Sequence, residues 1–172
     1  MAAEKIKIEP TSADKVYPIQ YDENYWQKNL SEFEYQVIRN KGTEYAFSGD
    51  LNNEKRKGIY YSRATGQPLF SSEHKYDSRT GWPSFWRPID DSAIDYYVDK
   101  KLFHTRIEVT DSSSGAHLGH VFEDGPKPTG LRYCINSVSM IFVAEGEEPP
   151  QIVKDYIAKF GASSPALRKS KS

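Results

Sequence analysis

The chain contains a single cysteine, Cys134, and two of its near neighbours could act on it. In an extended strand, residues two positions apart share a face, so Arg132, Cys134 and Asn136 are expected to project together. A neighbouring guanidinium favours the thiolate, which predicts a thiol more reactive than its reference pKa of about 8.5 implies. A lone cysteine in a strand is also commonly a small buried hydrophobic residue. These residues alone leave both interpretations open.

Two histidines, His117 and His120, are separated by two residues. This spacing suits one face of a helix, whereas in a strand the two rings point to opposite sides unless Gly119 permits a bulge. One interpretation is a metal centre completed by Cys134 and Asp124, since zinc takes three or four such ligands. The other interpretation is a pair of ordinary histidines in a sheet.

A third candidate is Trp82, which precedes Pro83 in the run Gly81–Phe85. The residue before a proline is held extended, which fixes the direction of the indole ring. Such a ring could form one wall of a pocket for a small apolar group, although tryptophan is also a common core residue. The later run Asp124–Pro126 is typical of a turn.

The composition is that of one soluble globular domain. Of 172 residues, 37% are hydrophobic and 27% are charged, which excludes a largely disordered chain. No apolar stretch is long enough to cross a membrane. The net charge of −1 argues against a nucleic-acid-binding protein, which needs a basic surface to contact phosphates. The expected partners are therefore small molecules or other proteins.

The first part of the chain predicts an arm followed by helices. Residues 1–20 are charged and contain prolines, as is typical of an extended arm. Asp22 is a suitable N-cap, and Ser31 and Glu34 form a capping-box pair that restarts the helix. Gly42 is placed to end it in a left-handed conformation. The apolar residues that recur with helical spacing, and that should line one face, are Trp26, Leu30, Phe33 and Val37.

Between Gly49 and Val143, short strand-like runs are separated by turn residues. The predicted strands are Gly58–Ser62, Thr105–Thr110, Val121–Phe122, Leu131–Ile135 and Ser137–Val143, and turns are predicted at Ala64–Pro68, Asp111–Gly115 and Glu123–Gly130. Polar and apolar residues alternate over Thr105–Thr110, so one face of that strand is expected to meet water. Runs this short predict an all-β core of two antiparallel sheets, tent-like or sandwich-like, with short N-terminal helices.

A C-terminal helix is predicted after two prolines. Pro149 and Pro150 suit the first turn of a helix, and Gly161 suits its end. The residues expected on its packed face are Ile152, Tyr156 and Phe160. The expected organisation is an arm over residues 1–20, one domain over 21–145, and a helix with a flexible tail over 146–172.

Five motifs, taken in order, resemble those of the B-type methionine sulfoxide reductases. They are Lys75–Ser78, Gly81–Phe85, His117–Phe122, Asp124–Pro126 and Arg132–Ser137, and Gly42–Glu44, Phe47 and Gly49 match the start of that domain. The resemblance covers roughly residues 22–144. It implies a peptide-methionine (R)-S-oxide reductase, an oxidoreductase that repairs oxidised proteins under oxidative stress.

The resemblance also implies a role for each matching residue. Cys134 falls on the nucleophile, which ends the reaction as a sulfenic acid. The residues implied to bind or protonate the sulfoxide oxygen are His117, His120 and Asn136. Trp82 falls on the ring that receives the substrate methyl group, and the other residues expected around the substrate are Arg132, Phe122 and Asp124.

The sequence departs from the family pattern in two places. Many members hold a structural zinc with four cysteines, and the corresponding positions here are Ser62, Thr65, Asp111 and Ser114, so no structural metal is expected. The position of a common resolving cysteine is Thr80, whether naturally or by replacement. With no second thiol in the sequence, an external reductant is expected, namely thioredoxin, glutathione with glutaredoxin, or another small thiol. No cofactor is expected to be bound.

Two other functions stay open at this stage: a non-catalytic binding module on the same scaffold, and a metal enzyme using His117, His120 and Cys134. The substrate is expected to be oxidised methionine, mainly in proteins, and the chain is expected to act as a monomer. Nothing from Met1 to Lys15 resembles a signal peptide. A lone thiol slightly favours the cytoplasm, but a chain without disulfides also suits the periplasm, an organelle or secretion.

Overall fold

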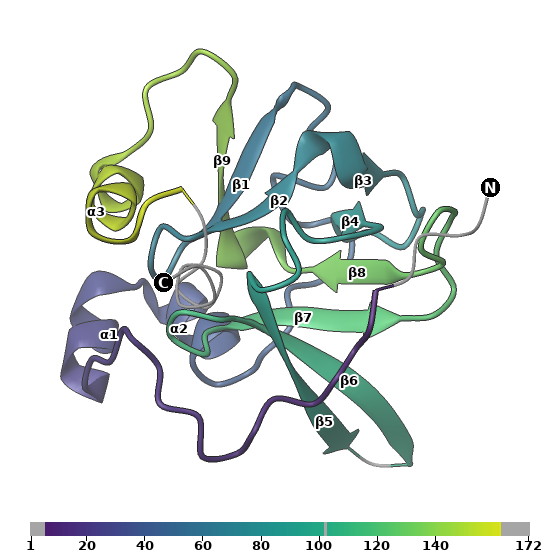
Figure 1. The fold of residues 1–172 in the computed structure, drawn as a ribbon, viewed down its shortest axis with the longest axis horizontal. Coiled ribbons are helices and arrows are strands. Elements are labelled where there is room, and N and C mark those ends of the chain that lie inside the picture. The colour runs from purple at the N-terminus through teal and green to yellow at the C-terminus, as the bar shows by residue number, and fades with distance from the viewer. Residues whose placement is uncertain (1–5, 102, 163–172) are drawn as a thin grey trace.

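Two antiparallel β-sheets form the body of the computed structural model, which describes residues 6–101 and 103–162 (Figure 1). The strands are β1 (Gly58–Ser62), β2 (Pro68–Ser71), β3 (Lys75–Tyr76), β4 (Ser84–Phe85), β5 (Ile94–Lys101), β6 (His104–Asp111), β7 (His117–Phe122), β8 (Arg132–Ile135) and β9 (Met140–Ala144). The smaller sheet has the order β2-β1-β9, and the larger has the order β3-β4-β8-β7-β6-β5. The predicted all-β core of two antiparallel sheets with short helices is confirmed.

The two sheets share one hydrophobic core. Two rings of the smaller sheet pack against Phe85 of the larger. Tyr60 meets it edge-on, with ring centroids 5.0 Å apart, and Phe70 stacks on it, with centroids 4.4 Å apart. The larger sheet also contributes Val109, Val121, Tyr133 and Ile135, all at most 5% exposed. Because side chains alternate along a strand, the residues between these must project from the opposite face of the larger sheet.

That opposite face carries the polar side chains. Cross-strand pairing joins Asp99 to Arg106, Glu108 to His120 and His120 to Cys134. Opposite residues in an antiparallel pair lie on the same face, so the strands β5, β6, β7 and β8 bring these residues together. The larger sheet is therefore apolar on its core side and polar on its other side.

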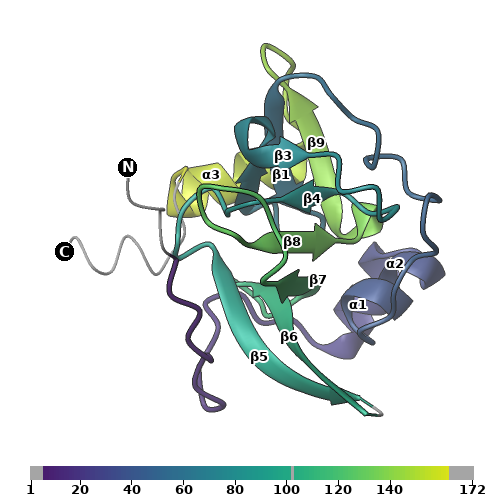
Figure 2. The same ribbon diagram turned by 90° about the vertical axis from the view of Figure 1, so that its right-hand side faces the viewer.

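Two short helices lie beside β7 in both ribbon views, α1 (Glu23–Asn29) and α2 (Glu32–Ile38) (Figures 1 and 2). The Asp22 carboxylate accepts a hydrogen bond from the backbone N–H of Tyr25, and Ser31 with Glu34 forms the predicted capping box. Two expectations were wrong. Lys41, not Gly42, has the left-handed backbone, with φ of 57°. Phe33, expected on the packed face, is 53% exposed.

The arm lies along the edge strand β5 over its described residues 6–20. The backbone N–H of Thr11 donates to the carbonyl of Tyr96 at 2.8 Å. Further along, the ammonium of Lys15 pairs with the carboxylate of Asp95, and the N–H of Ile19 donates to the carbonyl of Ser113. The arm thereby covers part of an edge that would otherwise expose unpaired backbone groups.

The third helix, α3 (Gln151–Phe160), begins directly after Pro150 and ends at Gly161, which has φ of 82°. Its buried residues are Val153, Tyr156 and Phe160, while Ile152 is only partly buried. The predicted flexible tail includes residues 163–172, which lie outside the described residues.

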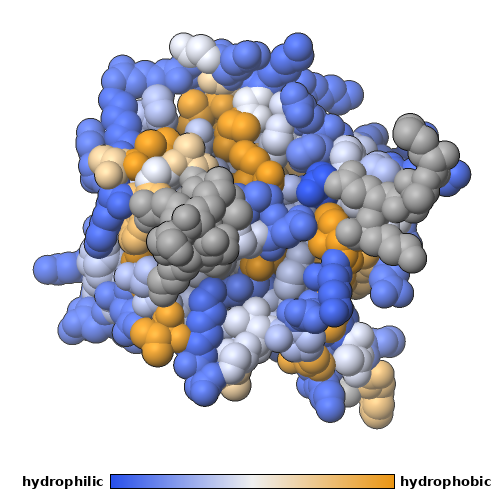
Figure 3. All heavy atoms as spheres, viewed as in Figure 1, coloured by the Kyte–Doolittle hydropathy of each residue, from blue (hydrophilic) through white to orange (hydrophobic). Residues whose placement is uncertain are grey.

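Among residues 6–101 and 103–162, no helix has the length and apolar character needed to span a membrane. The face seen in Figure 3 is largely hydrophilic, with small separate hydrophobic areas.

Three predictions of strands need correction. Residues Ser137–Ser139 form a 3-10 turn, η2, so the last strand starts only at Met140. Pro68, placed in a turn, begins β2, and the longest edge strand, β5, was not predicted. The polar face of Thr105–Thr110 does not meet water throughout, because Glu108 and Thr110 are each 2% exposed. The second half of β6 has side chains packed on both of its faces, which a single alternating pattern does not reveal.

Candidate active site

Cys134 opens into a cavity of about 260 Å³ on the polar face of the larger sheet. The residues that line it are Thr43, Thr80, Trp82, Arg106, Gly119, His120, Phe122, Arg132, Cys134 and Asn136. The structure thus brings together the predicted residues Cys134, His120, Asn136 and Trp82. The predicted neighbours Arg132 and Phe122 line the same cavity. His117 and Asp124 do not line it.

Strand pairing places the thiol beside an imidazole. Cys134 on β8 lies opposite His120 on β7, and side chains of opposite residues are nearest neighbours on one face of a sheet. Gly119 permits the two strands to approach, because a Cβ there would lie 2.0 Å from the carbonyl oxygen of Cys134. The thiol and a titratable ring therefore share one wall of the cavity.

A β-bulge turns His117 to the same side as His120. Val109 pairs with Gly119 and Thr110 pairs with His117, so β7 has one extra residue at this point. Their ring centroids lie 5.6 Å apart at an interplanar angle of 70°. The two histidines were expected to share a face of a strand only if Gly119 permitted a bulge, and this bulge is present.

His117 is held from behind by a buried carboxylate. Its Nδ1 lies 2.7 Å from Oε2 of Glu108, whose other oxygen lies 3.2 Å from the ammonium of Lys41. Burial raises the pKa of Glu108, but the contacts with His117 and Lys41 outweigh it and hold this pKa below its usual range. Nε2 of His117 is buried and has no hydrogen-bond partner among the described residues. His117 is not among the residues that line the cavity.

His120 is paired with a different acid. Its Nε2 lies 2.9 Å from Oδ2 of Asp99. Burial lowers the pKa of His120 and outweighs the opposite effect of Asp99, while Arg106 and His117 lower it further. The imidazole is therefore neutral over more of the pH range than an unperturbed histidine.

Arg132 favours the thiolate of Cys134 as expected, but the expectation that the pKa of this thiol lies below its reference value needs correction. Burial raises the pKa of Cys134, and the opposing effects of Arg132 and of a hydrogen bond from Thr80 do not overcome it. Arg132 is itself committed to Asp124, with Nε and Nη2 donating to the two carboxylate oxygens at 2.9 Å and 3.1 Å. Its guanidinium also lies over the ring of Phe122, 4.3 Å from the centroid. Asp124 thus holds Arg132, and its charge also raises the pKa of Cys134, although it does not line the cavity.

Asn136 and Trp82 are both tied to the backbone of Glu44. The N–H of Glu44 donates to Oδ1 of Asn136 at 2.9 Å, and its carbonyl accepts from Nε1 of Trp82 at 3.0 Å. Nδ2 of Asn136 donates to the carbonyl of Leu118 at 2.9 Å. These contacts fix which end of the amide is the donor and leave one of its N–H groups without a hydrogen-bond partner among the described residues.

Comparison with known proteins agrees with this arrangement. The SelR domain matches residues 30–144. A peptide methionine sulfoxide reductase MsrB from Methanosarcina barkeri is 52% identical over 129 residues, covering 75% of this chain and 91% of the relative. The MsrB of Methanosarcina mazei is 53% identical over 127 residues, which is 74% of this chain and 91% of the relative. The MsrB of Leptospira interrogans is 47% identical over 129 residues, covering 75% of this chain and 98% of the relative.

The chain belongs to the B-type methionine sulfoxide reductase family. It is therefore an oxidoreductase, as the motifs around Trp82, His120 and Cys134 imply.

The four positions at which many B-type reductases carry zinc-binding cysteines do meet in this chain, around one carboxylate. Oδ2 of Asp111 accepts from the hydroxyls of Ser62 at 2.7 Å and Thr65 at 3.4 Å. Oδ1 accepts from the N–H and hydroxyl of Ser114 at 2.7 Å and 2.8 Å, and from the N–H of Gly115 at 3.1 Å. Both oxygens are engaged by donors, so these residues do not fit a zinc ion. No group of three or more potential metal-binding side chains occurs among the described residues.

Three site features were missed from the sequence. Thr43 and Arg106 line the cavity, and Asp99 holds His120. Thr43 lies in a motif that matched the B-type reductases, so that match could have found it. Arg106 and Asp99 lie on strands that reach the site only through sheet pairing. No spacing of residues within one segment of the sequence predicts that pairing.

Proposed function

We propose that this B-type reductase converts methionine-R-sulfoxide to methionine with Cys134 as its only nucleophile. The observation that carries the proposal is the cross-strand pairing of Cys134 with His120 on the wall of one cavity that Trp82 also lines. A nucleophile, a proton-exchanging group and an apolar wall are the three parts that reduction of a methyl sulfoxide needs.

Different residues of the cavity lining bind the methyl group and the oxygen of the substrate. The indole of Trp82 and the ring of Phe122 receive the methyl group, and the unused N–H of Asn136 donates to the sulfoxide oxygen. Fixing methyl, oxygen and side chain at three points distinguishes the two epimers at sulfur. We assign the R epimer because the family resemblance implies it. The cavity of about 260 Å³ suits one side chain, which agrees with methionine sulfoxide presented by an oxidised protein as well as the free amino acid.

In the proposed reaction, the proton of the Cys134 thiol is transferred to the oxygen of the sulfoxide. Asp99 accepts the Nε2–H of His120, which leaves Nδ1 to take the proton of Cys134 and deliver it to the sulfoxide oxygen. Sγ attacks the substrate sulfur and forms an Sγ–S bond. The protonated oxygen then moves from the substrate sulfur to Sγ as the S–O and Sγ–S bonds break, which leaves methionine and a sulfenic acid on Cys134. The substrate sulfur gains two electrons and Sγ loses two. His117 supports the orientation of His120, and Arg132 with Asn136 stabilises charge on the oxygen.

An external thiol completes the cycle. Cys134 is the only cysteine in the sequence, so one thiol condenses with the sulfenic acid to give a mixed disulfide and water. A second thiol then releases Cys134 and leaves as an external disulfide. Thioredoxin and glutathione with glutaredoxin are the two reductants proposed for this role. The overall outcome is repair of oxidised methionine.

The test is turnover of each sulfoxide epimer by wild type and Cys134→Ser, with dithiothreitol as reductant. We expect the wild type to reduce the R epimer and the variant to be inactive with an unchanged circular dichroism spectrum. Turnover by Cys134→Ser would rule out the mechanism, and equal turnover of both epimers would rule out the three-point pocket. Thioredoxin and glutathione with glutaredoxin are then compared as sole reductants, and failure of both leaves another small thiol as the reductant.

A further inference from the structure

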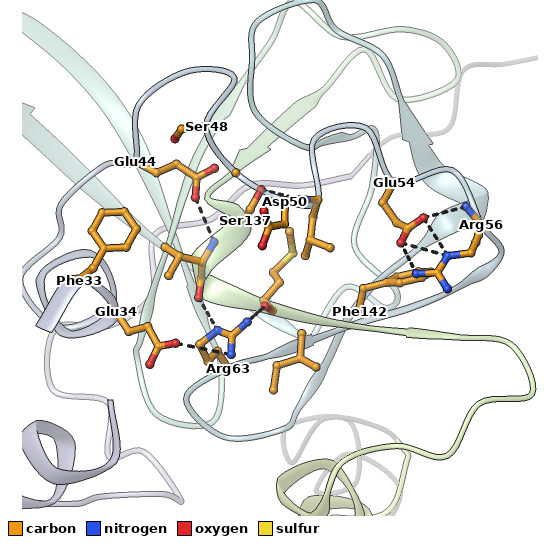
Figure 4. Close-up of a pocket in the computed structure, with 15 residues that line it drawn as sticks. Phe33, Glu34, Glu44, Ser48, Asp50, Glu54, Arg56, Arg63, Ser137 and Phe142 are labelled. Atoms are coloured by element: carbon orange, nitrogen blue, oxygen red, sulfur yellow. Dashed lines mark hydrogen bonds and ion pairs between the residues drawn. The ribbon is translucent and has the colours of Figure 1, made fainter. Parts of the chain in front are cut away.

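A second cavity, of about 470 Å³, is lined by Glu44 and Ser137, and each of these directly follows a residue, Thr43 or Asn136, that lines the proposed substrate pocket. Figure 4 shows Glu44 on the wall of this second cavity, with its carboxylate close to Ser137. The residue is 3% exposed. Its backbone contacts the substrate pocket, as described above, and its side chain points the other way.

Glu44 makes three hydrogen bonds that connect Asn136, Trp82 and the turn after Asn136. Its N–H holds Oδ1 of Asn136, its carbonyl holds Nε1 of Trp82, and Oε1 of its carboxylate accepts from the backbone N–H of Val138 at 3.0 Å. Val138 belongs to the 3-10 turn that directly follows Asn136. One residue therefore fixes the methyl-binding ring, the oxygen-binding amide and the turn that carries the amide.

The carboxylate is placed in a closed space. A Cβ at Gly49 would lie 2.3 Å from Oε2 of Glu44 and 2.2 Å from Oγ of Ser137, so the chain at Gly49 lies directly over the carboxylate. Oε2 is buried without a hydrogen-bond partner among residues 6–101 and 103–162. Burial of an unpaired carboxylate oxygen costs free energy. The Glu44 side chain is therefore better explained by the position it gives to the neighbouring backbone than by a gain in the stability of the fold.

We infer that Glu44 is a positioning residue for sulfoxide reduction, acting through Trp82 and Asn136 without touching the substrate. Its carboxylate anchors the backbone segment to η2, and its N–H and carbonyl then set the indole and the amide at a fixed separation. The inference rests on the proposed function, because Trp82 and Asn136 have these roles only in sulfoxide binding. A displacement of about 1 Å at such groups can lower a rate by about 100-fold.

Four variants test this: Glu44→Ala, Glu44→Asp, Glu44→Gln and the control Glu54→Ala. Glu54 lines the same second cavity but binds Arg56. We expect Glu44→Ala to lower kcat/KM for methionine-R-sulfoxide by about 10- to 100-fold. KM should rise through Trp82 and kcat should fall through Asn136. Glu44→Gln keeps an oxygen for the N–H of Val138 and should stay within about twofold of wild type, as should the control. Glu44→Asp is one methylene shorter and should be intermediate, and it serves if the alanine variant does not fold.

The second readout is the indole N–H resonance of Trp82 in the ligand-free protein, assigned by comparison with Trp82→Phe. It reports the hydrogen bond to the Glu44 carbonyl independently of turnover. We expect it to shift in Glu44→Ala and Glu44→Asp and to stay in place in Glu44→Gln and Glu54→Ala. Folded Glu44→Ala or Glu44→Asp with wild-type kcat/KM and an unshifted resonance would overturn the inference. Activity that falls only in proportion to the folded fraction, with no shift, would overturn it too. An inactive wild type would instead contradict the proposed function.

Discussion

Nε2 of His120 lies 2.9 Å from Oδ2 of Asp99, and His120 lies opposite Cys134 on the neighbouring strand β8. Burial lowers the pKa of His120 and raises the pKa of Cys134. The two pKa values therefore move apart. At pH values between these two pKa values, the predominant state is a neutral thiol beside a neutral imidazole. In this state the thiol still carries the one proton that reduction of a sulfoxide requires.

The first prediction concerns pH. Below the pKa of His120 the pair holds two protons, and above the pKa of Cys134 it holds none, so the rate of the first turnover should fall on both sides of a broad plateau. Unperturbed groups titrate near about 6.5 and about 8.5, and the limbs should lie outside these values. Asp99 raises the pKa of His120, so Asp99→Asn should move the acid limb to lower pH. Single-turnover methionine formation without reductant measures this. An acid limb that moves to higher pH would contradict the assignment of His120.

The second prediction separates the two histidines. His120 lines the cavity and His117 does not, so His120→Ala should lower kcat/KM by about 100-fold or more, the usual contribution of a general acid. His117→Ala should lower kcat/KM less but should destabilise the fold by about 2 to 3 kcal/mol, because Glu108 is left buried with one partner fewer. Steady-state kinetics and urea unfolding of both variants make the comparison. A larger kinetic loss for His117→Ala would reverse the roles proposed here.

The third prediction concerns the cluster around Asp111. Its carboxylate is 0% exposed and accepts hydrogen bonds from Ser62, Thr65, Ser114 and Gly115. Asp111→Ala removes the acceptor of the buried hydroxyls of Ser62, Thr65 and Ser114 and should lower the free energy of unfolding by about 3 kcal/mol. The exposed Asp91 is the matched control, and Asp91→Ala should change it by less than about 0.5 kcal/mol. Equal stability of the two variants in urea would show that the cluster contributes nothing.

The fourth prediction restores a second thiol. Thr80 lines the cavity, and its side chain hydrogen-bonds to the thiol of Cys134. A cysteine at position 80 should therefore attack the sulfenic acid and release water. Thr80→Cys, given one equivalent of methionine-R-sulfoxide, should lose both free thiols and form an internal disulfide, whereas the wild type should form none. Thiol titration and mass spectrometry detect this, and a persistent sulfenic acid in Thr80→Cys would show that the two side chains do not meet.

Local features of this chain were readable from the sequence because their partners lie within a few residues. The Asp22 cap and the Ser31–Glu34 capping box join groups three positions apart, and both occur as expected. Alternation along β8 likewise placed Arg132, Cys134 and Asn136 around one cavity. The end of α2 was predicted less well, because Lys41 takes the left-handed conformation usually given to glycine.

The sequence by itself determined which side chain we propose as the nucleophile, since it contains one thiol, and it determined that no disulfide can form within it. Only the tertiary structure decided how reactive that thiol is at rest, because a pKa depends on burial as well as on a neighbouring charge, and burial outweighs Arg132 here. It also decided which histidine reaches the cavity, through a bulge in β7 and the pairing of β7 with β8. The roles of Asp99, Glu108 and Glu44 were likewise decided there, because each acts across strands or loops that are distant in sequence. A pattern within one segment carries no information about which other segment will lie against it.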